Sequence, residues 1–248
     1  MVDIHAHILP GIDDGAEDMN SALEMAALAV ESGVEMIVAT PHSSAYGRQK
    51  NQWGRELKSA LLAFRAELER EKIPLRVYSG MEIYGSPEVP ELLTEGRLIG
   101  LNGSRYPLIE FAFTDYAVRA TEILEEVIAI GKTPVVAHPE RYLYVQEDPT
   151  LLNLWVEMGC LLQINKGSLL GRHGRQEELL SLALVERGFA CAVASDAHSP
   201  VMRTTWMKEA EKLLTEEFSP GTAKRLLTQN PVKLLKNESI QLPEPEWF

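Results

Sequence analysis

The sequence predicts an α/β protein whose parallel strands form a closed or nearly closed β/α barrel. Two observations carry this prediction: short, almost continuously apolar runs recur along the chain, and amphipathic helical patterns alternate with them. Apolar runs of this kind are typical of strands buried on both faces of a parallel sheet. Their alternation with helices over short connections indicates βαβ units. An open, doubly wound sheet is the alternative.

Seven apolar runs are rich in residues that favour strands, and seven such units suggest a closed or nearly closed barrel. They are Val2–Ile4, Met36–Thr40, Leu75–Gly80, Tyr106–Phe111, Thr133–Ala137, Cys160–Asn165 and Ala190–Ser195.

Helical periodicity occupies the intervals between these runs. In the segment from Trp53 to Glu71, for example, Leu57, Leu61, Phe64 and Leu68 recur at helical spacing. Glycines between a helix and the next strand predict left-handed caps. The predicted helices are Met19–Glu31, Trp53–Glu71, Ala117–Ile130, Thr150–Met158, Gln176–Glu186 and Thr204–Glu217, and the capping glycines are Gly33, Gly131, Gly159 and Gly188.

Length and composition favour one domain. The 248 residues are 45% hydrophobic and 24% charged, which is ordinary for a globular protein with a sizeable core. No linker rich in Pro, Gly or Ser divides the chain. We expect a single domain over residues 1–238, followed by an irregular tail over residues 239–248 that either docks through Trp247 or frays.

Charge and cysteine content exclude several classes of protein. A net charge of −12, from 36 acidic and 24 basic residues, disfavours nonspecific nucleic-acid binding. No apolar run approaches the ~18 residues that a membrane span needs, and the first residues lack the pattern of a signal peptide. The two cysteines, Cys160 and Cys191, cannot form a disulfide framework. We therefore expect a cytoplasmic protein without membrane insertion.

Five of the six histidines lie at or just beyond the end of a predicted strand. Only His173 lies in a loop with no such relation. Because the carboxyl ends of barrel strands open onto one face, the five imidazoles are expected to meet there. They are His5, His7, His42, His138 and His198.

Carboxylates occupy equivalent positions. Glu82 follows the third predicted strand, Glu110 lies inside the fourth, and Asp196 follows the last. Asp13 and Asp14 belong to the loop behind the first histidine pair. An ionised Glu110 in an apolar strand is costly unless it is paired or binds a metal.

Each of these residues alone is most simply explained as a polar loop residue or a salt-bridge partner. Their joint placement at one edge instead favours a metal centre. A ligand set of imidazoles and carboxylates without cysteine suits Mn, Fe or Zn. With roughly three to four protein ligands per catalytic ion, the set is large enough for two or three ions. Ions held this close commonly bind a phosphate and generate hydroxide for in-line attack.

The motifs resemble those of the polymerase and histidinol phosphatase (PHP) superfamily. The longer opening motif, Asp3–Gly15, is similar to the bacterial manganese-dependent protein-tyrosine phosphatases of capsular and exopolysaccharide gene clusters, the CpsB/YwqE type. The resemblance extends to about residue 235. The superfamily motifs are His5–His7, Thr40–His42, Gly80–Glu82, Glu110, Ala137–Arg141 and Ser195–His198.

The resemblance implies a seven-stranded barrel of PHP type with Mn²⁺, although Fe, Zn, Co or Mg would also suit the ligands. It assigns His5, His7, Glu82 and Asp196 to a first ion. A second ion would share Glu82 and add Glu110 and His138, and a third would use Asp14, His42 and His198. Asp14 is chosen over Asp13 on motif position. Arg141 and Arg203 correspond to the family's phosphate-binding arginines, although a surface salt bridge is the simpler explanation for Arg203 alone.

The implied substrate is the tyrosine-rich, phosphorylated tail of a bacterial tyrosine kinase that controls polysaccharide export. His42 or His198 could deliver a proton to the leaving group through water. Cysteine-based phosphatase chemistry is excluded, because the position six residues after Cys160 is Lys166 and that after Cys191 is Ala197, where an arginine is required.

Three alternatives stay open. The first is a PHP phosphatase for a small molecule such as histidinol phosphate. The second is a PHP nuclease, against which the negative charge counts. The third is a non-catalytic regulator with structural metals.

Overall fold

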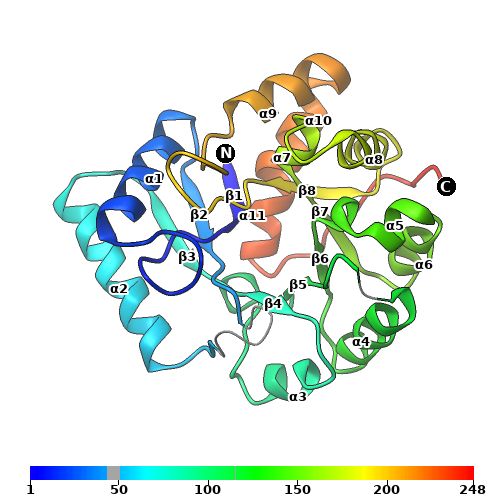
Figure 1. Cartoon of the computed structure of the whole chain (residues 1–248), viewed down its shortest axis with the longest axis horizontal. Helices are drawn as coiled ribbons and strands as arrows, with labels where there is room; N and C mark the ends of the chain where they lie inside the picture. The colour runs from blue at the N-terminus through cyan, green and yellow to red at the C-terminus, as the bar shows by residue number, and fades with distance from the viewer. Residues whose placement is uncertain (44–50, 115) are drawn as a thin grey trace.

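The structure is a computed structural model that describes residues 1–43, 51–114 and 116–248. In these residues eight strands, all paired in parallel, lie at the centre with helices around them (Figure 1). The strands are β1 (Val2–Ala6), β2 (Met36–Ala39), β3 (Arg76–Ser79), β4 (Glu82–Tyr84), β5 (Leu108–Glu110), β6 (Val135–Ala137), β7 (Leu161–Asn165) and β8 (Ala190–Ala194).

The prediction of one seven-stranded barrel is only partly right, because the eight strands form two sheets. The first sheet has the order β1-β2-β3 and the second has the order β4-β5-β6-β7-β8. The added strand is β4, which begins at Glu82, just beyond the end of the predicted strand Leu75–Gly80. A Cβ on Gly80 would lie 2.7 Å from Cγ1 of Val38, so the end of β3 packs very closely on β2. From Glu82 onward, β4 pairs with β5.

The two sheets meet at the carboxyl ends of their strands. One isolated bridge pairs Ala6 with Ala197, and another pairs His42 with Glu82. The backbone N–H of His7 donates to the carbonyl of Ala197 at 2.8 Å, which reinforces the first seam. Both seams therefore run through residues that the sequence singled out as metal ligands or their neighbours.

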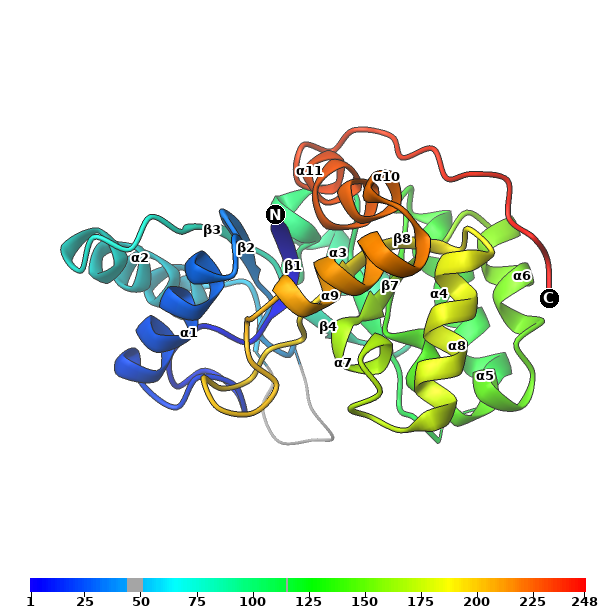
Figure 2. The ribbon, with the colours of Figure 1, turned by 90° about the horizontal axis from the view of Figure 1, so that it is seen from above.

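The predicted helices are present, with ends shifted by a few residues at most positions. Figure 2 shows α1 and α2 beside the first sheet and α4 to α8 around the second. Several short helices escaped prediction because fewer than seven residues carry little periodic signal. The helices are α1 (Met19–Glu31), α2 (Arg55–Arg70), α3 (Val89–Thr94), α4 (Ala117–Ala129), α5 (Leu143–Glu147), α6 (Leu151–Glu157), α7 (Lys166–Leu169), α8 (Arg175–Glu186), α9 (Lys208–Leu213), α10 (Pro220–Lys224) and α11 (Asn230–Leu235).

All four predicted capping glycines have positive φ, from 79° to 98°. Among the described residues, no helix has both the length and the apolarity that crossing a bilayer requires. Both cysteines are free and buried.

The apolar core has two parts. The larger part joins the outer helices to the strands, and a smaller cluster groups strand residues such as Val2, Leu108 and Val135 with Leu234 of α11. Figure 2 shows α10 and α11 over the end of the strands where β1 begins. The Asn230 side chain fastens α11 by donating to the Cys191 carbonyl at 2.8 Å. Because helices cover this end, the opposite, carboxyl end is the one left for a site.

The pairing of β1 with β2 has a register irregularity between Asp3 and Ala6. Ile4 belongs to the smaller cluster and Ala6 to the larger one, while His5 between them lies among the metal-ligand candidates. Consecutive residues of a regular strand face opposite ways, and a bulge reorients them. His5 and His7 are two residues apart, so their side chains face the same way, and both lie among the metal-ligand candidates.

The residues after α11 cross the outside of the molecule without helix or strand from 239 onward. The rings of Trp247 and Phe248 pack against Phe189 with centroids 5.8 Å and 5.2 Å away. The guanidinium of Arg187 lies 4.9 Å from the Phe248 ring centroid.

We predict that Phe64→Ala lowers the free energy of unfolding by about 3–5 kcal/mol, because the ring on α2 is fully buried and its loss leaves a cavity. Leu62→Ala on the same helix is the matched control: its side chain is 63% exposed, so a change within about 0.5 kcal/mol is expected. Urea-induced unfolding measures both. Equal effects of the two substitutions would contradict the assignment of the buried face.

Candidate metal centre

The carboxylate of Glu82, at the first position of β4, is the centre of the site. Its side chain is 1% exposed, and each of its oxygens contacts two imidazoles. Oε1 lies 3.1 Å from Nε2 of His5 and 3.0 Å from Nε2 of His138. Oε2 lies 3.1 Å from both Nε2 of His7 and Nδ1 of His42. A charge this deeply buried requires opposite charge around it, and the four rings provide positions where protons or metal ions supply it.

Asp196, just beyond β8, contributes a second buried carboxylate whose two oxygens face different groups. Oδ1 lies 3.5 Å from Nε2 of His5, 3.6 Å from Nε2 of His7 and 3.6 Å from Nδ1 of His198. This oxygen accepts no hydrogen bond from the described residues. A buried carboxylate oxygen that accepts no hydrogen bond and lies among three imidazoles is a group suited to binding a cation.

The other oxygen of Asp196 faces the arginines. Oδ2 accepts a hydrogen bond from Nη1 of Arg141 at 3.2 Å and another from Nη2 of Arg203. The side-chain amide of Asn165 donates to the same oxygen at 2.7 Å. One carboxylate thus separates the imidazoles from the two predicted phosphate-binding arginines, which lie together although they are 62 positions apart.

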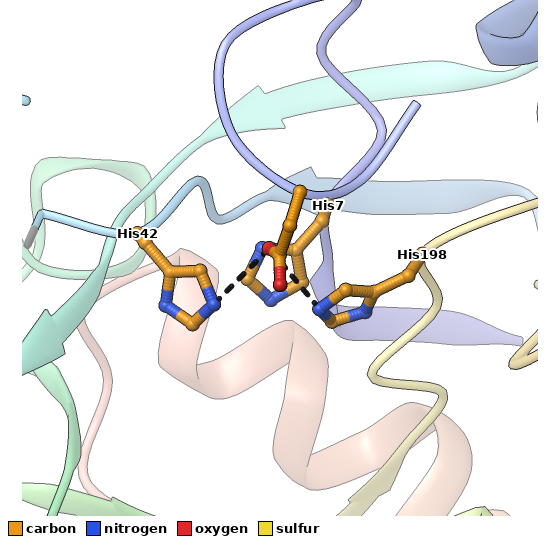
Figure 3. A group of neighbouring side chains, drawn as sticks. His7, His42 and His198 are labelled. Carbon is orange, nitrogen blue, oxygen red and sulfur yellow. Dashed lines mark ion pairs between the residues drawn. The ribbon is translucent and has the colours of Figure 1, made fainter. Parts of the chain in front are cut away.

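A third cluster lies at the outer side of the site. Oδ1 of Asp14 is 3.4 Å from Nε2 of His42 and 3.5 Å from Nε2 of His198. In Figure 3, His42 and His198 approach from opposite sides and His7 lies between them. The Asp14 side chain is 65% exposed, so this cluster is the part of the site most open to solvent.

Asp13 lies close by but makes a different kind of contact. Its Oδ2 accepts from Nδ1 of His7 at 2.7 Å and from the backbone N–H of His42 at 2.9 Å. It therefore orients His7 from behind and leaves Nε2 free to face the site, which is the usual arrangement behind a metal-binding histidine.

Three groups of side chains have donor atoms close enough to share an ion. All five predicted histidines and all four predicted carboxylates lie in this region, but the grouping differs from the predicted assignment in two respects. His7 also joins the outer group, and Glu110 groups with a different histidine. Glu110 lies 3.0 Å from Nδ1 of His42 and groups with that ring, whereas His138 contacts Glu82 without joining Glu110. The groups are His5, His7, Glu82 and Asp196; His7, Asp14, His42 and His198; and His42, Glu82 and Glu110.

Two polar side chains of β7 complete the site, and the sequence analysis missed them. Oε1 of Gln163 accepts from Nδ1 of His5 at 2.8 Å, and Asn165 holds Asp196. They are two residues apart on a strand otherwise made of apolar residues. Polar residues at alternate positions of an apolar strand have their side chains on the same face, and this spacing was the signal available in the sequence.

Lys166 is a further residue that sequence analysis assigned no role. Its ammonium group is buried and donates to the carbonyls of Thr204 and Trp206, the second at 2.8 Å. These two residues lie one and three positions after Arg203, so the lysine holds the segment next to this arginine. Burial lowers the pKa of Lys166 to about 8.

Backbone strain is concentrated at the same place. His138, Asp196 and Arg203 have φ of 35°, 49° and 50°, values that residues other than glycine seldom adopt. Such conformations persist only where the surrounding structure enforces them, and they cluster at functional sites.

The electrostatics show how strongly these groups interact. Burial by itself lowers the pKa of His7 and His42, but the carboxylates of Asp13 and Glu82 outweigh it and raise the two values to about 10 and about 12. Burial and the neighbouring His7 lower the pKa of His198 to about 3. The carboxylates thus hold positive charge inside the cluster even without a metal.

The donor set fits divalent cations. Nε2 of His5 and Nε2 of His7 lie only 3.3 Å apart, and both face Glu82 and the unpartnered oxygen of Asp196. Two imidazole nitrogens that close cannot both carry a proton toward each other without repulsion, whereas both can donate a lone pair to one ion. Nitrogen and oxygen ligands without sulfur suit manganese, iron and zinc.

Comparisons with known proteins show the family to which this chain belongs. A family model for capsular polysaccharide synthesis, CpsB/CapC, matches residues 1–236. The tyrosine-protein phosphatase YwqE of Bacillus subtilis is 40% identical over 99% of this chain and 96% of its own length. The tyrosine-protein phosphatase CpsB of Streptococcus pneumoniae is 30% identical over 97% of this chain and all of its own.

A solved structure is similar over the whole chain. It comes from the "Crystal structures of YwqE from Bacillus subtilis and CpsB from Streptococcus pneumoniae, unique metal-dependent tyrosine phosphatases". It superposes with a TM-score of 0.94 at 40% identity, covering 100% of this chain and 99% of the other.

We predict that Glu82→Gln removes about half or more of the bound transition metal, because Glu82 belongs to two of the three ligand groups. Elemental analysis of protein purified without chelators measures the metal content per chain. Glu91→Gln, at an exposed position of α3, is the matched control and should keep the metal content of the unsubstituted protein. Unchanged metal in Glu82→Gln would contradict the assignment.

We also predict the pH dependence of the metal-free protein. The pKa of His7 is raised from 6.5 to about 10, so its protonation stabilises the fold fully below pH 6.5, and this stabilisation is lost as the pH rises toward 10. The thermal midpoint of chelator-treated protein should therefore fall over this window when measured by calorimetry. His7→Asn should flatten the dependence. A midpoint of the metal-free protein that rises with pH would contradict the prediction.

Proposed function

This chain belongs to the CpsB/CapC family of capsular polysaccharide synthesis, and we propose that it is a metal-dependent phosphomonoesterase that acts on protein phosphotyrosine. One observation carries the proposal beyond the family relationship. Three overlapping groups of metal ligands and two arginines meet at one edge of the strands, joined by the two oxygens of Asp196. Cation ligands beside guanidinium groups suit the binding of a phosphate dianion.

We assign the residues as follows. His5, His7, Glu82 and Asp196 would hold one ion, and Asp14, His42 and His198 a second, with His7 nearby. Glu82 and Glu110 would hold a third together with His138, as the resemblance implies, or with His42, as the distances favour. Mn²⁺ is the proposed metal, because imidazoles and carboxylates without thiolates suit it, and Fe, Zn, Co and Mg are the competitors.

Divalent ions bound here would polarise phosphoryl oxygens and lower the pKa of water, which is the chemistry that such ions supply to phosphatases. The chain's own contribution is to bind and orient the phosphate. The guanidiniums of Arg141 and Arg203 both reach Asp196 Oδ2, so a phosphate at that point would receive hydrogen bonds from both. Planar guanidinium groups match the spacing of phosphate oxygens, and they stabilise the negative charge that spreads over them during in-line transfer.

The leaving group of a phosphotyrosine substrate needs little acid catalysis from the protein. The phenol of tyrosine has a pKa near 10, so its phenolate departs without a strong general acid. His42 and His198 face Asp14 at the solvent-exposed side of the site, where either could pass a proton through water to the departing oxygen.

The proposed partner is a bacterial tyrosine kinase with a phosphorylated, tyrosine-rich tail. The capsular family relationship supports it, together with the exposed outer cluster around Asp14, which leaves the site open to a protein segment. A cytoplasmic location is part of the proposal and rests on the two buried cysteines, which form no disulfide.

Two reagents test the chemistry. Burial raises the pKa of the Cys160 and Cys191 thiols to about 12, so neither offers a thiolate at neutral pH. We expect a chelator to abolish hydrolysis of a phosphotyrosine peptide and added Mn²⁺ to restore it, while iodoacetamide leaves the rate unchanged. Activity that resists the chelator and is lost on alkylation would overturn the mechanism.

Substrate selectivity is tested on the same preparation, with metal content measured in parallel. Turnover of the phosphotyrosine peptide should exceed that of histidinol phosphate and of a phosphodiester. Faster hydrolysis of histidinol phosphate would instead support a small-molecule phosphatase, and faster cleavage of the diester would support a nuclease.

A further inference from the structure

Phe113 is the aromatic residue placed directly against the phosphate-binding part of the site. It lies in the loop after β5, three residues beyond Glu110, and its side chain is half-buried. Its ring centroid lies 4.5 Å from the guanidinium carbon of Arg141. The ring also meets the edge of His138, with centroids 6.0 Å apart and planes at 81°. Phe113 therefore touches one phosphate-binding arginine and one metal-ligand candidate without being either.

The backbone holds this ring in place. The carbonyl of Phe113 accepts from the N–H of Leu143 at 2.9 Å, which ties the loop to the first turn of α5. The ring of Tyr142 packs on Phe113 with centroids 6.1 Å apart. The phenol of Tyr142 accepts from the N–H of Phe111 at 3.0 Å and donates to the carbonyl of Ala137 at 2.7 Å. The aromatic face is thus preorganised rather than a loosely held loop side chain.

The position of Arg141 decides what this ring can contact. Its guanidinium contacts both Oδ2 of Asp196 and the ring of Phe113. A phosphate bound by Arg141 has its ester group pointing away from the buried ligands, since Glu82, His138 and Asp196 are at most 2% exposed and close the inner side. The half-buried side chain of Phe113 provides apolar surface next to Arg141, between the buried ligands and solvent.

We propose that Phe113 is a specificity-determining residue that packs on the aryl ring of the substrate and so favours aryl over alkyl phosphates. This inference rests on the proposed phosphatase function. Aromatic rings pair well at centroid distances of about 4.5–7 Å, within reach of a ring joined to a phosphate at Arg141. A phosphoserine or phosphothreonine side chain has no ring to make this contact, so the residue separates phosphotyrosine from the other phosphomonoesters of proteins.

Non-hydrolysable ligands test the proposal without interference from leaving-group chemistry. The probes are phenylphosphonate and methylphosphonate, measured as competitive inhibitors of p-nitrophenyl phosphate hydrolysis and by direct calorimetric titration of the metal-loaded protein. In Phe113→Ala, we expect binding of phenylphosphonate to weaken about five- to tenfold, while methylphosphonate changes less than about twofold. Phe113→Leu keeps an apolar side chain against His138, and its affinity for phenylphosphonate should fall about threefold. Phe113→Tyr should bind both phosphonates like the unsubstituted protein.

Arg141→Lys is the reference variant, because it damages only the phosphate contact. In this variant, binding of both phosphonates should weaken by the same factor. The same pattern in Phe113→Ala and Phe113→Leu, at unchanged metal content, would mean that Phe113 acts only by positioning Arg141, and it would overturn the proposal. An unchanged ratio of the two affinities would overturn it as well. Failure of the proposed function is distinguishable, because the unsubstituted protein would then neither hydrolyse p-nitrophenyl phosphate nor bind either phosphonate.

Discussion

The structure depends on the burial of one carboxylate, that of Glu82, where two sheets meet. Isolated in an apolar interior, this charge would be strongly destabilising, and four imidazoles at 3.0–3.1 Å offset it. Three of these rings, His5, His7 and His42, come from the sheet β1-β2-β3, whereas Glu82 and His138 come from the other. The candidate cation ligands therefore also join the two halves of the fold, and metal binding is expected to be coupled to its stability.

Asp196 divides the site into two functional sides. One oxygen faces the imidazoles and the other faces Arg141 and Arg203, with Asn165 fixing the orientation between them. The proposed positions of the cations and of the phosphate would then be adjacent and distinct. The positive φ of Asp196 and of Arg203 shows that the backbone is strained to hold this arrangement, a cost that the surrounding hydrogen bonds offset.

The break between β3 and β4 connects the fold to the chemistry. A continuous third strand would remain in register with β2 and carry its last residues within the first sheet. The interruption at Gly80 and Met81 transfers the chain to the second sheet, so that Glu82 pairs with β5 while bridging to His42. Gly80, packed closely against Val38, lies two residues before the shared carboxylate of Glu82.

The sequence by itself determined the alternation of parallel strands and helices, the family, and the membership of the ligand region. Strand-end histidines such as His7 and His138 are local signals, because parallel topology alone brings strand ends together. Tertiary structure decided the division into two sheets, the pairing of Glu110 with His42, and the orienting roles of Asp13, Gln163 and Lys166. These depend on distances of a few ångströms between segments far apart in the chain. Apolar periodicity specifies which face of a strand is buried, but it carries no information about which polar atoms meet across a seam.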